Sequence, residues 1–138
     1  MVKQLELAVR AEMDVHARAC GLTTLQYTAL TVLERHPGMS GAELSRRSFV
    51  SPQSGNEMVG HLERKGLIER TPDDRNRRIL RITLTKDGAN LVKKCDKWMD
   101  ELEGQMLIGL TSRDAKELRK ILLTCVRNLE EQRVLDGS

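Results

Sequence analysis

Aromatic residues are scarce in this 138-residue sequence, which contains one Trp, one Tyr and one Phe. Large rings anchor most protein cores, so a small chain with an aromatic content of 2% gains little stability from its own interior. Hydrophobic residues make up 39% of the chain and charged residues 31%, which is a helix-prone composition. We therefore expect one mainly helical domain that buries additional surface between two subunits.

Long apolar runs are also lacking. No stretch approaches the roughly 20 residues that a membrane-spanning helix needs, and the first residues show no apolar signal-peptide region. We expect a cytoplasmic protein that has no membrane partner. The three cysteines form no CxxC pair, and in a reducing cytoplasm we expect free thiols at Cys20, Cys95 and Cys125.

The patterns of common enzymes and metal sites are missing as well. The sequence shows no nucleophile–base–acid constellation, no phosphate-binding glycine loop and no pair of catalytic carboxylates. The three histidines have no HxxxH spacing, so a metal site built from His16, Cys20 and His36 with nearby acids is not expected. We expect no enzymatic activity, no cofactor and no bound metal.

Positive charge is modest in total but concentrated in place. The net charge is only +3, which by itself does not require a nucleic-acid partner. Acidic residues collect in the terminal helices, whereas arginines gather at positions 46, 47, 64, 75, 77 and 78. Such segregation is typical of a protein that presents one basic face.

The segment from Met39 to Gly88 organises the rest of the chain. Ser51-Pro52 is a strong helix start, because Ser caps a free backbone N–H and Pro has none, and Gly66 ends that helix. Residues 67–71 and 79–85 have strand patterns, and turn residues separate them. A helix followed by an arginine-tipped hairpin is typical of a DNA-binding winged helix-turn-helix.

Amphipathic helices are predicted on both sides of this segment. Their starts are expected at Lys3, Thr23 or Thr24, Ser40, Thr85, and Thr111 or Ser112. A monomer core is one interpretation of their apolar stripes. We favour a dimerisation bundle, because the central lobe already has a small core of its own, made of Leu30, Leu33, Leu44, Val50, Leu62 and Leu84.

The predicted fold is therefore mainly α with a small β-hairpin wing. In this prediction residues 1–138 form a single domain. The winged-helix lobe covers about 22–88, and the dimerisation helices cover about 1–20 and 86–132. Residues 133–138 are expected to be a frayed tail.

Five motifs occur in a fixed order: GLTTLQYTALTVL, AELSRR, VSPQSGNEMVGHLERKGLIER, the basic tip DDRNRR, and LRITLTKDG. This order resembles the MarR family of bacterial transcriptional regulators, and the resemblance covers nearly the whole chain. It implies a homodimeric winged-helix protein that binds pseudo-palindromic DNA and releases it on sensing a small molecule or an oxidant. A repressor controlled by a small aromatic or phenolic effector is the favoured interpretation.

Four residues depart from the family pattern. Many relatives carry Asp-Arg where this chain has Gly60-His61, and the acid is commonly tied to a wing arginine. Asn76 stands where relatives often have Asp, and Gly55 where they often have an apolar residue. We therefore expect a weaker connection between helix and wing, and a softer helix.

The candidate DNA-contacting residues follow from their chemistry and position. Gln, Asn and Ser can read base edges, and base contacts are expected from Gln53, Ser54, Asn56 and His61. Arg77 is expected to enter a narrow minor groove. Helix N-termini and basic side chains bind phosphates, so backbone contacts are expected from Ser51, Arg46, Arg47, Arg64, Lys65, Arg75 and Arg78.

The resemblance also implies a control site. A pocket between the terminal helices and the lobe is expected to involve His16, Tyr27 and Trp98. Some family members sense oxidants through a cysteine in the first helix, and Cys20 is the candidate for such redox control here. A helix C-terminus opposes the thiolate, however, so a structural thiol is favoured.

Other interpretations stay open at this point. Cys95 and Cys125 are expected to be core residues. The protein could lack an effector and act as a constitutive architectural DNA binder. It could also be a protein–protein adaptor that uses its winged helix as a docking surface.

Overall fold

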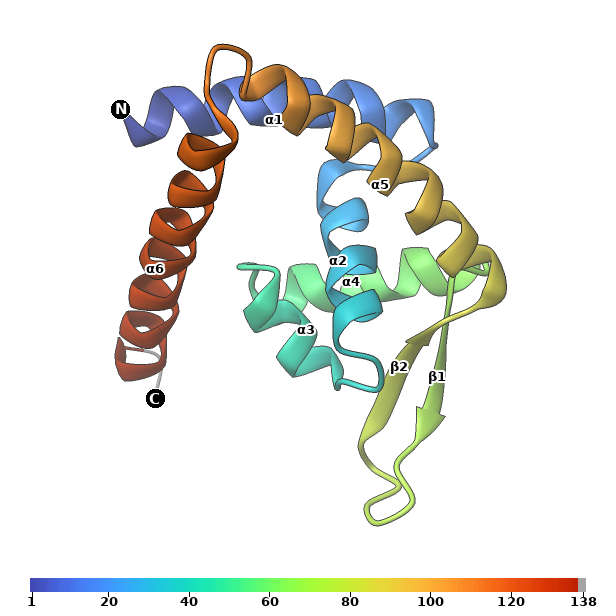
Figure 1. Cartoon of the computed structure of the whole chain (residues 1–138). Helices are drawn as coiled ribbons and strands as arrows, with labels where there is room; N and C mark the ends of the chain where they lie inside the picture. The colour runs from blue at the N-terminus through green and yellow to red at the C-terminus, as the bar shows by residue number, and fades with distance from the viewer. Residues whose placement is uncertain (137–138) are drawn as a thin grey trace. The chain divides into compact units, whose positions relative to one another are not determined.

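The computed structural model describes residues 1–136. It confirms a mainly helical protein with one β-hairpin (Figure 1). The chain divides into two compact units, unit 1 from Met1 to Asp100 and unit 2 from Glu101 onward. The elements are α1 Val2–Ala19, α2 Thr24–Arg35, α3 Gly41–Arg47, α4 Pro52–Arg64, β1 Ile68–Pro72, β2 Leu80–Leu84, α5 Lys86–Met106 and α6 Ser112–Asp136.

Side-chain caps fix where α2 and α3 begin. Thr23 Oγ1 accepts from the backbone N–H of Gln26 at 3.1 Å, and Gln26 Oε1 accepts from the N–H of Thr23 at 3.1 Å. Ser40 Oγ accepts from the N–H of Glu43 at 3.2 Å. The Glu43 carboxylate forms an ion pair with Arg47. The predicted starts of α2 and α3 are therefore confirmed.

The hairpin is antiparallel and runs in register from Ile68 opposite Leu84 to Pro72 opposite Leu80. The loop before α3 adds a short bridge to it, because the N–H of Gly38 donates to Ile82 O at 3.0 Å and the N–H of Ile82 donates to Met39 O at 2.9 Å. The hairpin is thereby joined to the helices at its base, while its tip projects away from them (Figure 1).

The core of unit 1 largely follows the predicted leucines. Leu30, Leu44 and Leu62 are fully buried, and Leu33 nearly so. Val50 and Leu84 were expected in this core but are only half-buried. Other buried side chains complete the core, among them Met58, Val59, Ile82, Val92 and Tyr27.

Gly55 has a packing role that the sequence did not indicate. A Cβ atom at this position would lie 1.8 Å from Ser45 Oγ and 2.9 Å from Ser45 Cβ. Only glycine therefore lets α4 approach α3 this closely. The sequence suggested only that Gly55 softens the helix, and the structure adds a close contact between two helices at this residue.

Unit 2 contains the long helix α6. Its start is capped reciprocally, with Thr111 Oγ1 accepting from the N–H of Asp114 and Asp114 Oδ2 accepting from the N–H of Thr111, each at 3.0 Å. None of its residues is buried. Cys125 is exposed, so its expected core position is wrong.

Two further sequence expectations can be compared with the helices. The helix α6 continues through Asp136, so the prediction of a frayed tail is wrong for residues 133–136, and residues 137–138 lie outside the described part. Within residues 1–136, each helix is too short or too polar to cross a bilayer.

Candidate nucleic-acid interface

The helix α4 is strongly two-sided. Met58, Val59 and Leu62 are buried, while Gln53 and Asn56 are exposed. Apolar residues at this spacing fix the helix on the core and leave its polar side toward solvent. The residues predicted to read bases therefore share one accessible surface.

The N-terminus of α4 carries a small hydroxyl cluster. Ser51 Oγ accepts from the backbone N–H of Ser54 at 3.2 Å and lies 3.1 Å from Ser54 Oγ. Pro52 occupies the first turn, where no backbone donor is needed. Both serines are exposed at the positive end of the helix dipole, an arrangement that suits a phosphate group.

Several of the residues predicted to contact DNA from the C-terminal end of α4 contact other residues of this chain. Arg64 Nη2 lies 3.1 Å from His61 Nδ1. Lys65 Nζ donates to the carbonyl of Gly21 at 2.6 Å and to Gln26 Oε1 at 3.4 Å. Lys65 therefore holds the turn after α1, a role that competes with its predicted phosphate contact.

The two arginines of α3 also differ from each other. Arg47 Nε forms an ion pair with Glu43 at 3.3 Å, and its Nη1 lies 3.3 Å from His36 Nε2. Arg46 is exposed and has no carboxylate partner among the described residues. Of the pair, Arg46 has the guanidinium that is available to a ligand.

The tip of the hairpin is held together by Asp73. Its carboxylate accepts from Arg81 Nε at 2.6 Å and from the backbone N–H groups of Arg75 and Asn76 at 3.2 and 3.0 Å. The hydrogen bond from Arg81, followed by that from Asn76, lowers the pKa of Asp73. Arg81 Nη1 also donates to Gly38 O at 2.9 Å, so the tip is tied to the loop before α3.

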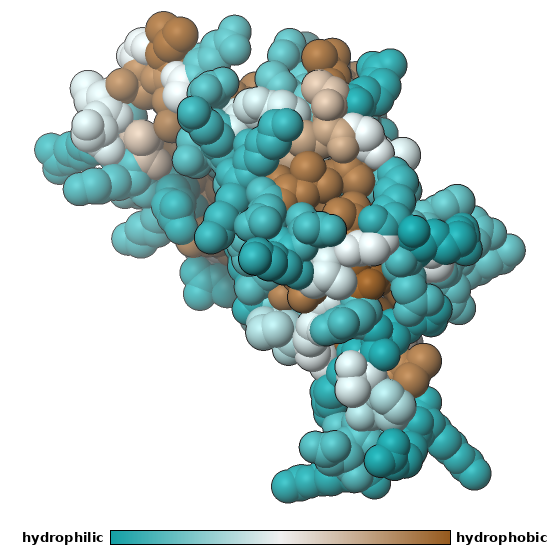
Figure 2. Space-filling view, turned by 90° about the vertical axis from the view of Figure 1, so that its right-hand side faces the viewer, coloured by the Kyte–Doolittle hydropathy of each residue, from teal (hydrophilic) through white to brown (hydrophobic). Residues whose placement is uncertain are grey.

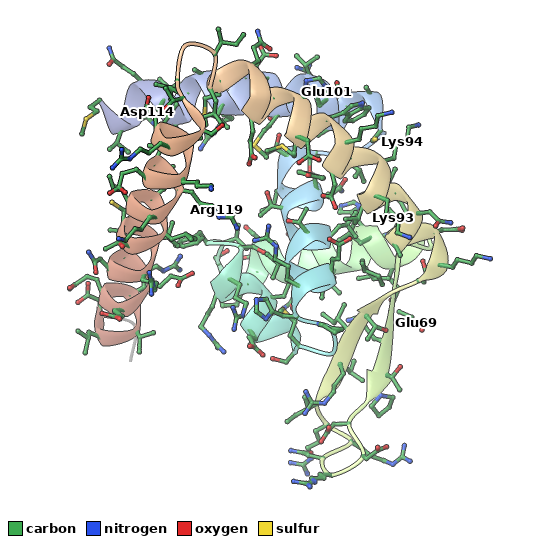
Figure 3. The ribbon with its side chains drawn as sticks, in the orientation of Figure 1. Glu69, Lys93, Lys94, Glu101, Asp114 and Arg119 are labelled. Carbon is green, nitrogen blue, oxygen red and sulfur yellow. The ribbon has the colours of Figure 1, made fainter. Side chains whose placement is uncertain are left out.

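Three arginines at this tip have no such partner. Within residues 1–136, no carboxylate forms an ion pair with Arg75, Arg77 or Arg78, and all three are exposed. The wing tip is hydrophilic in Figure 2, and side chains with nitrogen ends extend from it in Figure 3. Their charge is therefore free to meet an anion in solution.

A side-chain brace connects α4 to the wing, which corrects the expectation of a weakened connection. Arg70 of β1 donates to Glu63 through Nε at 2.9 Å and through Nη2 at 2.8 Å. This bidentate geometry is the strong form of an arginine–carboxylate pair. The hydrogen bond from Arg70 lowers the pKa of Glu63. The sequence did not reveal it, because both residues looked like ordinary exposed charges.

A groove of about 550 Å³ joins the helix to the wing. Asn56 of α4 and Arg78 of the hairpin both line it, together with Arg70, Arg81 and Ser40. The sequence predicted Asn56 and Arg78 as separate contacts, and the structure brings them to one open groove.

The predicted control-site residues also meet in unit 1. His16, Tyr27 and Trp98 line a cavity whose other walls are Met13, Ala17, Cys95 and Met99. The His16 and Trp98 rings are 5.2 Å apart and tilted by 36°. The cavity volume is about 10 Å³, enough for roughly one water molecule.

Two polar features border this cavity. Tyr27 Oη donates to Asp96 Oδ1 at 3.5 Å, and burial, with Asp96 second, raises the pKa of Tyr27. Cys95 lies beside Cys20, with 3.1 Å between their sulfur atoms. The sequence singled out Cys20 but gave no signal that Cys95 is its neighbour, since 75 residues separate the two.

Comparison with known proteins identifies the family. The sequence model of the MarR family matches residues 21–79. The HTH-type transcriptional repressor Rv2887 of Mycobacterium tuberculosis is 31% identical over 114 residues, which cover 83% of this chain and 82% of that protein. The chain belongs to the MarR family.

Other MarR-type proteins agree with this assignment. The transcriptional activatory protein BadR of Rhodopseudomonas palustris is 34% identical over 110 residues, covering 74% of this chain and 63% of BadR. A crystal structure of Rv2887 with salicylic acid is 28% identical, with a TM-score of 0.74 over 90% of this chain and 92% of that one. The transcriptional regulator SlyA, at 22% identity, shares the fold with a TM-score of 0.84 over 95% and 92% of the two chains.

Proposed function

We propose that this MarR-family regulator is a homodimeric repressor that binds a pseudo-palindromic operator and is released by a small aromatic or phenolic acid. The observation that carries the proposal is the combination of three wing-tip arginines that have no carboxylate partner within residues 1–136 with the exposed polar face of α4. A groove lined by Asn56 and Arg78 connects the two. Its site of action would be the bacterial cytoplasm.

The DNA-binding mode follows from the shapes of these elements. A helix fits the major groove, where Gln53 and Asn56 would meet base edges. A guanidinium group fits a narrow minor groove, where Arg77 would be attracted by concentrated negative potential. Ser51, Arg46, Arg75 and Arg78 would contact phosphates and set the register.

The exposed apolar residues of α6 support a dimer. A lone helix that shows this much apolar surface to water is unfavourable, so a second copy of the chain is the expected cover. A twofold dimer would place the two α4 helices about 34 to 36 Å apart, one helical turn of DNA. The α6 residues concerned are Ile121, Leu122, Leu123, Val126 and Leu129.

The cavity beside Trp98 supports control by a ligand. Rv2887 has been solved with salicylic acid, an aromatic acid of the class proposed here. A cavity of about 10 Å³ is too small for such a molecule, so binding must separate the walls that α1, α2 and α5 provide. A ligand that prefers the opened state then shifts the protein toward it, which would change the spacing of the reading helices.

Selection of bound sequences from random DNA duplexes tests this function. The expected result is one pseudo-palindromic sequence whose half-site centres are about one turn apart. Sedimentation of the free protein should give a dimer. A stable monomer, or recovery of no preferred sequence at low salt, would contradict the proposal.

Salicylic acid is the probe for the ligand step. It should lower the affinity for the selected operator and change the fluorescence of Trp98, the single Trp of the chain. Benzyl alcohol, which keeps the ring but lacks the acid, is the matched control. An operator affinity that stays constant at saturating salicylic acid would remove the ligand step but leave DNA binding in place.

A further inference from the structure

Two thiols lie in contact in unit 1, although they are far apart in the sequence. Cys20 follows the last residue of α1, and Cys95 lies in α5. Their sulfur atoms are 3.1 Å apart. A disulfide bond is about 2.0 Å long, so the two atoms need to approach by only about 1 Å.

Both cysteines belong to well-anchored segments. The backbone N–H of Cys20 donates to Ala17 O at 3.0 Å. The next carbonyl, that of Gly21, is held by Lys65 Nζ at 2.6 Å. Cys95 is 2% exposed and belongs to the hydrophobic core. Their proximity is therefore set by the packing of the end of α1 beside α5.

We propose that Cys20 and Cys95 form a redox modification site, which a hydroperoxide converts into an intrachain disulfide. The two sulfurs differ in access, since Cys20 is half-buried and Cys95 is buried. Burial, with the hydrogen bond to Cys20, raises the pKa of the Cys95 thiol to about 12. Cys20 is therefore the thiol that meets the oxidant, and Cys95 is the one that completes the bond.

The reaction balances in two steps. The Cys20 thiolate attacks one peroxide oxygen and the O–O bond breaks, which leaves a sulfenic acid on Cys20 and releases hydroxide or alkoxide. Cys95 Sγ then attacks Cys20 Sγ and the S–O bond breaks; the departing hydroxide takes the Cys95 proton and forms water. The two thiols lose two electrons and the peroxide gains them.

The disulfide has consequences that can be measured without DNA. It closes a loop between residues 75 positions apart, and long closed loops restrict the unfolded chain. The oxidised protein should therefore melt at a higher temperature than the reduced protein. Cys95 also lines the cavity beside Trp98, so the fluorescence of that single Trp should change on oxidation.

The experiment uses the full chain and the third cysteine as its control. Cys125 is exposed, and Cys125→Ser leaves the proposed pair intact. Reduced C125S protein is treated with an equimolar amount of hydrogen peroxide and mapped by mass spectrometry without reduction. The expected product is a monomeric chain that has lost two hydrogens, contains a linked Cys20–Cys95 peptide and has no free thiol. Dithiothreitol should restore both thiols and the lower melting temperature.

Variants of the pair separate this site from ordinary thiol oxidation. Cys20→Ser and Cys95→Ser should each abolish the linked peptide and the change in Trp98 fluorescence. Mapping of C125S gives the answer even where Cys95→Ser fails to fold, because it leaves the pair untouched. A sulfinic acid on Cys20 beside a free Cys95 thiol would overturn the proposal, and so would a wild-type disulfide through Cys125. Since no readout uses DNA, the site and the proposed repressor function can fail separately.

Discussion

The base and the tip of the β-hairpin both carry arginines, but the two regions use them differently. At the base, Arg70 is bound to Glu63, and Arg81 is bound both to Asp73 of the tip and to the loop before α3. At the tip, Arg75, Arg77 and Arg78 have no carboxylate partner among the described residues.

This difference separates arginines whose charge is already paired within the protein from arginines whose charge is available to a ligand. A guanidinium that already has a carboxylate gains little from a phosphate, because it must first give up its partner. An unpaired, hydrated arginine releases counterions from DNA when it binds, which favours association. The base therefore orients the wing, and the tip is the part suited to binding.

The largest expected effect is at the tip. Arg77→Ala should lower operator affinity by about 1 to 3 kcal/mol and reduce the magnitude of the salt slope by about 1, because one phosphate-neutralising charge is lost. The melting temperature should stay unchanged. Affinity is measured by fluorescence anisotropy at several salt concentrations.

Lys94→Ala is the matched control for charge. Lys94 extends from α5, away from the wing tip, so its loss should change neither affinity nor slope appreciably (Figure 3). If Arg77→Ala behaves like Lys94→Ala, the tip is not the binding surface.

The second prediction concerns Gln53, a neutral side chain, in contrast to the charged Arg77. Gln53→Ala should relax base preference at one position in each half-site, at a cost of about 1 to 3 kcal/mol of discrimination, because a base-reading hydrogen bond is lost. The salt slope should be that of the wild type. Repeating the duplex selection with the variant measures this, and Glu57→Ala on the same helix is the comparison. An unchanged sequence preference would rule out Gln53 as a reader.

A smaller effect is expected at the base. Arg70→Ala breaks the pair with Glu63, and because the two side chains are 35% and 41% exposed, solvent screening keeps the loss of stability small. Urea unfolding of Arg70→Ala, Glu63→Gln and the double variant measures the coupling. Operator affinity should fall less than in Arg77→Ala, since only the orientation of the wing is affected. Single-variant effects that simply add in the double variant would show that the pair contributes nothing.

The smallest effect is a pH dependence at Asp73. Its pKa is lowered in the folded protein, so its contribution to stability is present above the unfolded pKa and is lost as pH falls through the folded value. Asp73→Asn should therefore reduce the fall in melting temperature below about pH 4. Thermal unfolding from pH 7 to pH 2 compares the two proteins. Parallel curves would mean that Asp73 is not coupled to Arg81 in solution.

Local chemistry made much of the fold predictable. The caps at Thr23, Ser40 and Ser51 are read from short sequence windows, because each acts within one helical turn. The alternation in β2 and the turn before it predicted the hairpin for the same reason. The tail was harder, since residues 133–138 are too few to show a helical period of their own, and α6 continues to Asp136.

Contacts between distant residues account for the misses. Val50 and Leu84 have the right chemistry for the core, but the packing of neighbouring elements leaves them half-buried. Cys125 lies on an apolar stripe of α6 and is nevertheless exposed. The site residues were predicted by type and position, whereas the partner of Lys65, the carbonyl of Gly21, lies 44 residues away in the chain and was not predicted.

By itself, the sequence determined the order of elements, the capped helix with its polar face and the cluster of arginines on a hairpin. These features depend on interactions between residues a few positions apart, so a short stretch of sequence is enough to predict them. Only the tertiary structure decided which arginines are neutralised, that Gly55 must lack a side chain, and that Cys20 meets Cys95. Those outcomes depend on how segments far apart in the chain pack in space, and no local sequence pattern indicates which distant segments come into contact.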